Sequence, residues 1–133
     1  MNVQKITPIL YVTEIESCLP FWVDRLSFNK TAEVPHDGRI GFVILEKDGL
    51  EIMYQTHDSV AADVPAIATT PMGGSLLFIE VDDIDATETA LEGIAHVIPR
   101  RTTFYGATEI VVREPAGNTV IFAQFGNKEA EGD

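Results

Sequence analysis

One pattern, two apolar runs joined by a glycine turn, occurs twice in this chain and limits the folds that it can adopt. Residues 113–125, REPAGNTVIFAQF, pass from turn formers around Gly117 into a β-branched and aromatic run, which predicts a tight hairpin feeding a strand. Residues 42–55, FVILEKDGLEIMYQ, have the same order, with Gly49 in the turn. Two hairpins of one kind in 133 residues predict an internal repeat.

The segments that precede the hairpins also correspond. Each half begins with an apolar strand, continues through a polar turn into a short helix, and ends in a hairpin. We start the first helix near Cys18 because a proline such as Pro20 is tolerated only in the first helical turn. The predicted strands are residues 4–12, 39–45, 50–55, 75–81, 109–113 and 119–125, with a further one near 29–33; the predicted helices are residues 18–26 and 87–93, the second after an acidic turn over 82–86.

The order of these segments predicts an α+β fold of paired βαβββ modules. The modules span about residues 3–56 and 74–125 of a single domain over residues 1–125, and each sheet has one face covered by its helix. The two bare faces are expected to form a cupped mixed β-sheet with a concave cleft, which suits a small ligand. Residues 57–74 are a predicted connector and residues 126–133 a predicted disordered tail.

Composition narrows the classes of partner. With 21 acidic residues against 9 lysines and arginines, the net charge of −12 repels nucleic acid and anionic membrane surfaces, so we expect neither as a partner, and it favours cationic ligands. The single Cys18 cannot form an internal disulfide, and no apolar run is long enough to cross a bilayer. We therefore expect a soluble, cytoplasmic protein.

Two motifs resemble those of a known family. Residues 7–28, TPILYVTEIESCLPFWVDRLSF, and residues 113–125 are similar to segments of the vicinal oxygen chelate superfamily, which contains glyoxalase I, extradiol dioxygenases, fosfomycin-resistance enzymes and bleomycin-resistance proteins. The combination FWxDRLxF followed by PAGNxVxF is most similar to the bleomycin-resistance branch. The resemblance covers residues 6–125 and implies a homodimer that sequesters a cationic glycopeptide antibiotic without chemistry.

The catalytic members of this superfamily are implied to hold a divalent metal with four side chains, one from each of four strands. By motif, these positions fall on Thr7, Glu51, Leu76 and Ile121. Only Glu51 is a competent ligand, because leucine and isoleucine have no donor atom and threonine is a poor one. We therefore expect no metal and no other cofactor, and no catalytic residue.

Other side chains do not rebuild a catalytic site. The histidines, His36, His57 and His96, lack the spacing that would place two imidazoles on one face, and we expect them at the surface. Cys18 has no histidine base nearby in the sequence, so we interpret it as a small residue at a helix start. Trp22 is expected in the core.

Strand alternation predicts which side chains share a face with the four mapped positions. The face that carries them is predicted to be apolar and aromatic with a few polar groups, and the opposite face to pack under the helices. The predicted ligand-binding residues on the first face are Tyr11, Glu51, Met53, Gln55, Phe78 and Glu80, accompanied by Ile9, Ala123 and Phe125; the predicted packing residues are Ile52, Tyr54, Leu77, Ile79, Val120 and Phe122.

Two alternatives stay open for the charged residues of this cleft. Glu51 either attracts a cationic group of the ligand or is a remnant of the metal-ligand set that is hydrated or paired with Arg39 or Lys47. The predicted loop over residues 100–106, RRTTFYG, either contacts the ligand or is a solvated turn. In the first case its arginines, Arg100 and Arg101, bind an anionic group and argue against a strictly cationic ligand, while Phe104 and Tyr105 cover the cleft. Tyr105 is therefore the seventh predicted ligand-binding residue.

The function that the sequence predicts is non-catalytic binding of a small molecule. A cationic antibiotic of the bleomycin type is the expected ligand, and resistance by sequestration is the expected role, with a homodimer as the working form. Two alternatives remain: a metal-dependent glyoxalase-like lyase or dioxygenase with an atypical site, and a sensor of an unknown metabolite.

Overall fold

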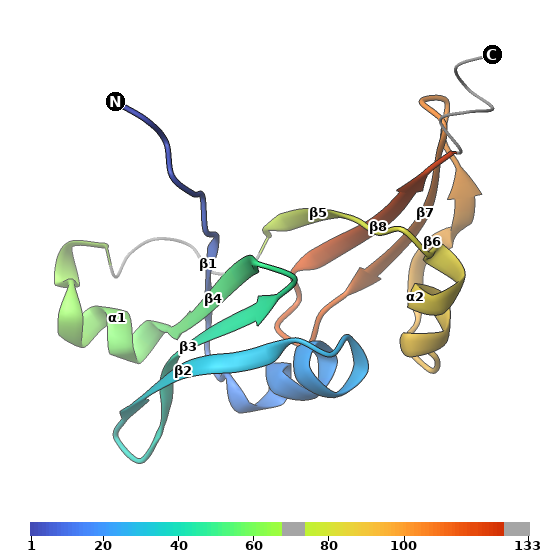
Figure 1. Ribbon diagram of the computed structural model, residues 1–133. Helices are drawn as coiled ribbons and strands as arrows, with labels where there is room; N and C mark the ends of the chain where they lie inside the picture. The colour runs from blue at the N-terminus through green and yellow to red at the C-terminus, as the bar shows by residue number, and fades with distance from the viewer. Residues whose placement is uncertain (68–73, 127–133) are drawn as a thin grey trace. The chain divides into compact units, whose positions relative to one another are not determined.

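The chain divides into two compact units between residues 73 and 74, and each unit has its own β-sheet. The structure is a computed structural model that describes residues 1–67 and 74–126. Within these residues, Figure 1 shows a sheet in each unit, with several short helical elements in the first unit and one helix in the second. No helix within these residues is long and apolar enough to cross a membrane.

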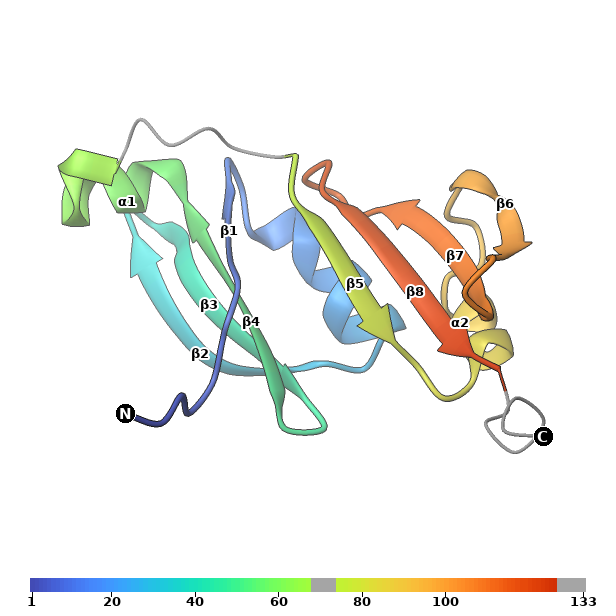
Figure 2. The ribbon, with the colours of Figure 1, turned by 90° about the horizontal axis from the view of Figure 1, so that it is seen from above.

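The first unit is a mixed sheet with helical turns between its first two strands. Its strands are β1 (Ile9–Val12), β2 (Asn29–His36), β3 (Arg39–Lys47) and β4 (Leu50–Thr56), in the order β1-β4-β3-β2. Strand β1 pairs parallel to β4, and the remaining pairs are antiparallel (Figure 2). The helical elements are the 3₁₀ turn η1 (Glu16–Cys18), the π-helix η2 (Pro20–Arg25), the helix α1 (His57–Asp63) and the 3₁₀ turn η3 (Pro65–Ile67).

The second unit repeats this topology. Its elements are β5 (Leu76–Glu80), α2 (Ile84–Ala90), β6 (His96–Thr102), β7 (Ala107–Arg113) and β8 (Thr119–Phe125). The strand order is β5-β8-β7-β6, and β5 pairs parallel to β8 (Figure 2). Both units are therefore βαβββ modules, which confirms the predicted α+β class and the internal repeat.

The core of the first unit lies on the side of the sheet that the π-helix covers. Leu10, Ile52 and Tyr54 are buried there, while their neighbours along the strands are more exposed. The indole Nε1 of Trp22 donates a hydrogen bond of 2.8 Å to the Tyr54 hydroxyl, and the Phe28 ring packs edge-on at 5.1 Å from the indole. The predicted core role of Trp22 and the predicted packing face are confirmed in this unit.

The core of the second unit lies between its sheet and α2. Val120 and Phe122 of β8 are buried, as predicted for the packing face, together with Ile84 at the start of α2. The backbone N–H of Ile84 donates to the side-chain oxygen of Gln124 at 2.8 Å, which ties the helix start to β8. Alternation therefore leaves Ile121, Ala123 and Phe125 on the face away from the helix.

The two hairpin turns occur where the glycines predict them. Asp48 and Gly49 both have positive φ, 54° and 81°, which is the backbone of a tight type I′ hairpin turn. Gly117 has a φ of 92° in the second hairpin turn. There the buried Glu114 side chain accepts a hydrogen bond of 2.6 Å from the Asn118 backbone.

The helices differ from the prediction in their type and limits. The first helix is a 3₁₀ turn followed by a π-helix, although Pro20 does occupy a first-turn position. The second helix begins at Ile84 rather than at residue 87, and residues 82–86 are not all turn. The reason is that the Asp83 side chain caps the helix by accepting from the Ala86 N–H at 3.0 Å.

Three further segments correct the prediction. Residues 57–63 of the predicted connector are helical because the Thr56 hydroxyl caps α1 by accepting from the Ser59 N–H at 3.2 Å. Arg100 and Arg101 lie on strand β6, where a loop was predicted. Strand β1 begins at Ile9, directly after Pro8, and β2 extends to His36. Most of the predicted disordered tail, residues 127–133, and residues 68–73 of the connector lie outside the described residues.

Candidate functional site

The open face of the first sheet, opposite Trp22, carries the predicted ligand-binding residues of that unit. Register places Tyr11 beside Gln55 and Ile9 beside Met53 on the neighbouring strands β1 and β4. Tyr11, Met53 and Gln55 are half-buried, whereas the residues that alternate with them along β1 and β4 are buried. The structure thus brings these three side chains onto one face, as alternation predicts; their contact with a ligand stays a prediction.

A groove of about 510 Å³ continues this face toward helix α1. The Gln55 amide lies in it and donates a hydrogen bond of 3.2 Å to the Ser59 hydroxyl. His36, which was expected at the surface, lies at the end of β2 and also lines the groove. The groove is lined by Val34, Pro35, His36, Phe42, Gln55, Ser59, Ala62 and Asp63.

Glu51 has an ion-pair partner that the sequence did not indicate. The Lys5 ammonium lies 2.6 Å from the Glu51 carboxylate. Arg39, one of the predicted partners, pairs instead with Glu14 at 3.0 Å. Because Lys5 balances the Glu51 charge, a cationic ligand group must displace Lys5 to use this carboxylate.

The face of the second sheet opposite α2 has a row of aligned positions across its four strands, and three of the four are charged. Register aligns Glu80 with Ala123, Ala123 with Glu109, and Glu109 with Arg101. Arg101 therefore shares a face with the predicted ligand-binding residue Glu80, and Phe78 lies two residues from Glu80 on the same side of β5.

Glu109 is the buried centre of this row. Its side chain is only 1% exposed. Its Oε1 accepts two hydrogen bonds from Arg101, from Nε at 3.1 Å and from Nη2 at 2.9 Å, and its Oε2 accepts one from the Tyr105 hydroxyl. Sequence reasoning missed this residue. The sequence did place Glu109 on a predicted strand. That strand was predicted to form a hairpin with the strand that carries Ala123.

Four aromatic rings form a series of neighbouring pairs that includes Tyr105, the ring bonded to Glu109. Phe125 lies 6.4 Å from Phe78 and 6.1 Å from Tyr105, and Tyr105 lies 5.0 Å from Phe104. Phe104 is fully exposed, and Phe78 and Tyr105 are each more than 40% exposed. The hydrogen bond to Glu109 is the main cause that raises the pKa of Tyr105, and burial and the Glu109 charge add to it. The structure thus connects two predicted site residues, Phe78 and Tyr105, through Phe125.

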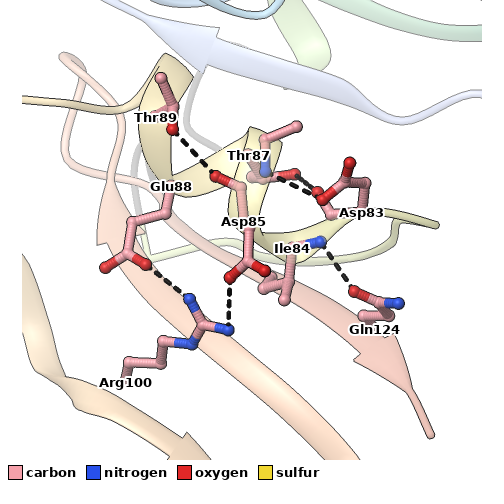
Figure 3. A network of polar contacts seen from close by, with 9 residues as sticks. Asp83, Ile84, Asp85, Thr87, Glu88, Thr89, Arg100 and Gln124 are labelled. Atoms are coloured by element: carbon pink, nitrogen blue, oxygen red, sulfur yellow. Dashed lines mark hydrogen bonds and ion pairs between the residues drawn. The ribbon is translucent and has the colours of Figure 1, made fainter.

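Arg100 has a different role from its neighbour. It lies 2.9 Å from Asp85 and 2.5 Å from Glu88 of α2, as Figure 3 shows. These two hydrogen bonds are the main cause that raises the pKa of Arg100. Arg100 therefore faces the helix, where two carboxylates already pair with it, so of the two arginines Arg101 is the better placed to contact a ligand.

The fold of this chain was compared with those of known proteins, and it matches solved structures. No sequence family and no curated protein matches the chain. A glyoxalase/bleomycin resistance protein/dioxygenase from Nocardioides aligns with a TM-score of 0.69 at 18% identity, over 94% of this chain and 85% of that one. The chain has the glyoxalase/bleomycin resistance/dioxygenase fold.

Proteins with this fold include both enzymes and binding proteins. Lactoylglutathione lyase from Agrobacterium tumefaciens aligns with a TM-score of 0.74 at 17% identity, over 93% of this chain and 96% of that one. TnmS3, an antibiotic binding protein from Streptomyces sp. CB03234, aligns with a TM-score of 0.69 at 22% identity, over 95% and 99%. The glyoxalase/bleomycin resistance fold is thus common to proteins of both classes.

The four positions onto which the family resemblance maps a metal-ligand set do not fit a metal. Leu76 and Ile121 have no donor atom, and Thr7 lies before β1. Glu51, the one carboxylate, is paired with Lys5. Within residues 1–67 and 74–126, no three His, Cys, Asp or Glu side chains gather as a metal site would require. Cys18 is fully buried, which does not suit an attacking thiol.

Proposed function

We propose that this protein binds a small molecule without changing it. Leu76 and Ile121 carry the proposal: they leave the metal positions without donors and add apolar surface on the same face as the aromatic rings. The proposed ligand contacts are Tyr11, Glu51, Met53, Gln55, Phe78, Glu80 and Tyr105. Exposed aromatic rings beside a few polar groups are the usual composition of a small-molecule site.

A cationic antibiotic of the bleomycin type is the proposed ligand, and sequestration in the cytoplasm is the proposed role. The net charge of −12 attracts such a drug, and Glu80 has no ion-pair partner among the described residues. Binding lowers the concentration of free drug, which needs affinity and abundance but no bond change. The protein is proposed to act as a homodimer; a monomer at micromolar concentration in sedimentation would argue against this form.

Calorimetric titration with metal-free bleomycin tests the proposed ligand. We expect saturable binding that weakens between low and physiological salt, because ions screen the attraction between an acidic protein and a cationic drug. Absence of heat at both salt concentrations would exclude bleomycin.

One second candidate is a lyase, which the likeness to lactoylglutathione lyase favours. It predicts about one bound divalent metal per chain after growth in metal-supplemented medium and activity that a chelator abolishes. A metabolite sensor is the other alternative, and a screen of unmodified metabolites would identify its ligand.

A further inference from the structure

We propose that Arg101 recognises a negatively charged oxygen group of an aromatic ligand on the open face of the second sheet, and that Glu109 is the residue that positions Arg101. This inference rests on the proposed small-molecule binding and specifies its ligand class. It predicts an aromatic ligand that carries a carboxylate, sulfonate or phenolate, which is an alternative to the cationic bleomycin-type ligand proposed above. Glu80, on the same face, leaves room for a cationic group elsewhere in that ligand.

The guanidinium of Arg101 is held along one edge only. Its Nε and Nη2 both donate to the same oxygen of Glu109, at 3.1 Å and 2.9 Å. A guanidinium has five N–H groups, so two on Nη1 and one on Nη2 remain for another partner. Among the described residues Arg101 has no further hydrogen bond, and its side chain is 53% exposed. The free edge has the geometry that binds a carboxylate through two parallel hydrogen bonds.

Glu109 fixes this edge before a ligand arrives. Its carboxylate is fully buried on β7, an interior strand of the sheet, and both of its oxygens accept hydrogen bonds. A buried carboxylate with a charged partner keeps that partner close, because an unpaired charge there would be costly. Arg101 therefore loses little side-chain freedom when a ligand binds, which favours affinity.

The same carboxylate also holds one ring of an aromatic surface. The Tyr105 hydroxyl donates a hydrogen bond to Glu109, and the Tyr105 ring neighbours those of Phe104 and Phe125, with centroids 5.0 Å and 6.1 Å away. Phe78 extends this surface beyond Phe125. Glu109 thus joins an anion-binding group to a stacking surface. A planar ring that bears an acidic oxygen matches both parts at once.

The adjacent Arg100 is a matched control. It lies on the same strand but faces α2, where Asp85 and Glu88 occupy it, as Figure 3 shows. Arg100→Gln and Arg101→Gln remove the same charge from neighbouring positions. If the two variants differ in ligand binding, the difference therefore results from the face of the sheet on which each arginine lies and not from the change in net charge.

Fluorescence titration of the full chain tests the inference with two planar probes, anionic 1-anilinonaphthalene-8-sulfonate and cationic proflavine. We expect Arg101→Gln to weaken sulfonate binding about tenfold, the loss of one charge-assisted contact, and Arg100→Gln to change it less than about twofold. Arg101→Lys should restore only part of the affinity, because an ammonium cannot form the fork. Proflavine binding should not weaken in either variant.

Glu109→Gln should also weaken sulfonate binding, with thermal unfolding measured to show that the variant is folded. If it does not fold, the Arg101 variants still decide the question. Equal effects of Arg100→Gln and Arg101→Gln, or binding of proflavine alone, would overturn the inference but leave small-molecule binding standing. Failure of both probes to bind would overturn the inference and count against the proposed function as well.

Discussion

The indole Nε1 of Trp22 and the hydroxyl of Tyr54 form a hydrogen bond of 2.8 Å inside the core of the first unit, and both side chains are fully buried. This bond joins the π-helix to β4, so it fixes the sheet whose other face carries Tyr11 and Gln55. Tyr54→Phe leaves the Trp22 N–H without this acceptor. We expect a loss of about 1–3 kcal/mol in the free energy of unfolding, the usual cost of an unpaired buried donor.

Urea unfolding followed by tryptophan fluorescence measures this loss, since Trp22 is the single tryptophan of the sequence. Tyr11→Phe on the open face is the matched control and should change the unfolding free energy by less than about 0.5 kcal/mol. Equal effects of the two substitutions would contradict the assignment of Tyr54 to a hydrogen-bonded core.

The start of α2 depends on Asp83. Its carboxylate accepts from the Ala86 N–H at 3.0 Å, and Asp82 beside it makes no such contact. We expect Asp83→Ala to lower the free energy of unfolding by about 1 kcal/mol, the typical value of a helix cap. Asp82→Ala, which removes the same charge, is the control and should have little effect in the same denaturant titration. A larger effect at Asp82 would show that charge, not capping, matters here.

The Lys5–Glu51 ion pair gives a test of the acidic contact in the first unit. If Glu51 attracts a cationic ligand, Glu51→Gln should weaken bleomycin binding several-fold, since a charge-assisted contact is worth about 1.5–3 kcal/mol before competition. Lys5→Ala should strengthen binding, because it frees the carboxylate now 2.6 Å from Lys5. Calorimetric titration with bleomycin measures both changes in affinity. Unchanged affinity in Glu51→Gln would remove Glu51 from the proposed site.

Tyr105 should produce a change in stability at high pH. The hydrogen bond to Glu109 raises its pKa above the ordinary value of 10.0, so the folded protein binds the phenolic proton more tightly than the unfolded chain does. Its contribution is therefore fully present below pH 10 and is lost as the pH rises through the raised pKa. Tyr105→Phe should lessen this alkaline loss in thermal unfolding experiments. Absorbance titration at the tyrosinate band should show that the wild-type protein has one more late-titrating group than the variant.

Much of the fold could be predicted because it depends on local rules. Alternation along β1 and β4 placed Tyr11, Met53 and Gln55 on one face, and glycine turns located both hairpins. The helix α1 was missed because it is short and its cap, Thr56, ends a strand whose pattern gives no sign of a following helix. Local sequence also gave no sign that a π-helix would replace an α-helix after Pro20.

The charged part of the candidate site could not be predicted, because it depends on pairing between strands. Residues 100–106 were predicted to form a loop, yet β6 pairs with β7 through register shifts between His96 and Ile98 and between Ile98 and Arg101. Only this shifted register sets Arg101 opposite Glu109. Lys5 is likewise 46 residues from Glu51, so no local pattern links them.

The central claim is that the ligand is bound and released unchanged. The most direct measurement is to incubate stoichiometric protein with metal-free bleomycin, with and without added divalent metal, then denature the protein and determine the mass of the recovered drug. We expect the drug to be protein-bound before denaturation and of unaltered mass after it in both conditions. A product of different mass that forms only with metal would contradict the account and favour a metal-dependent enzyme.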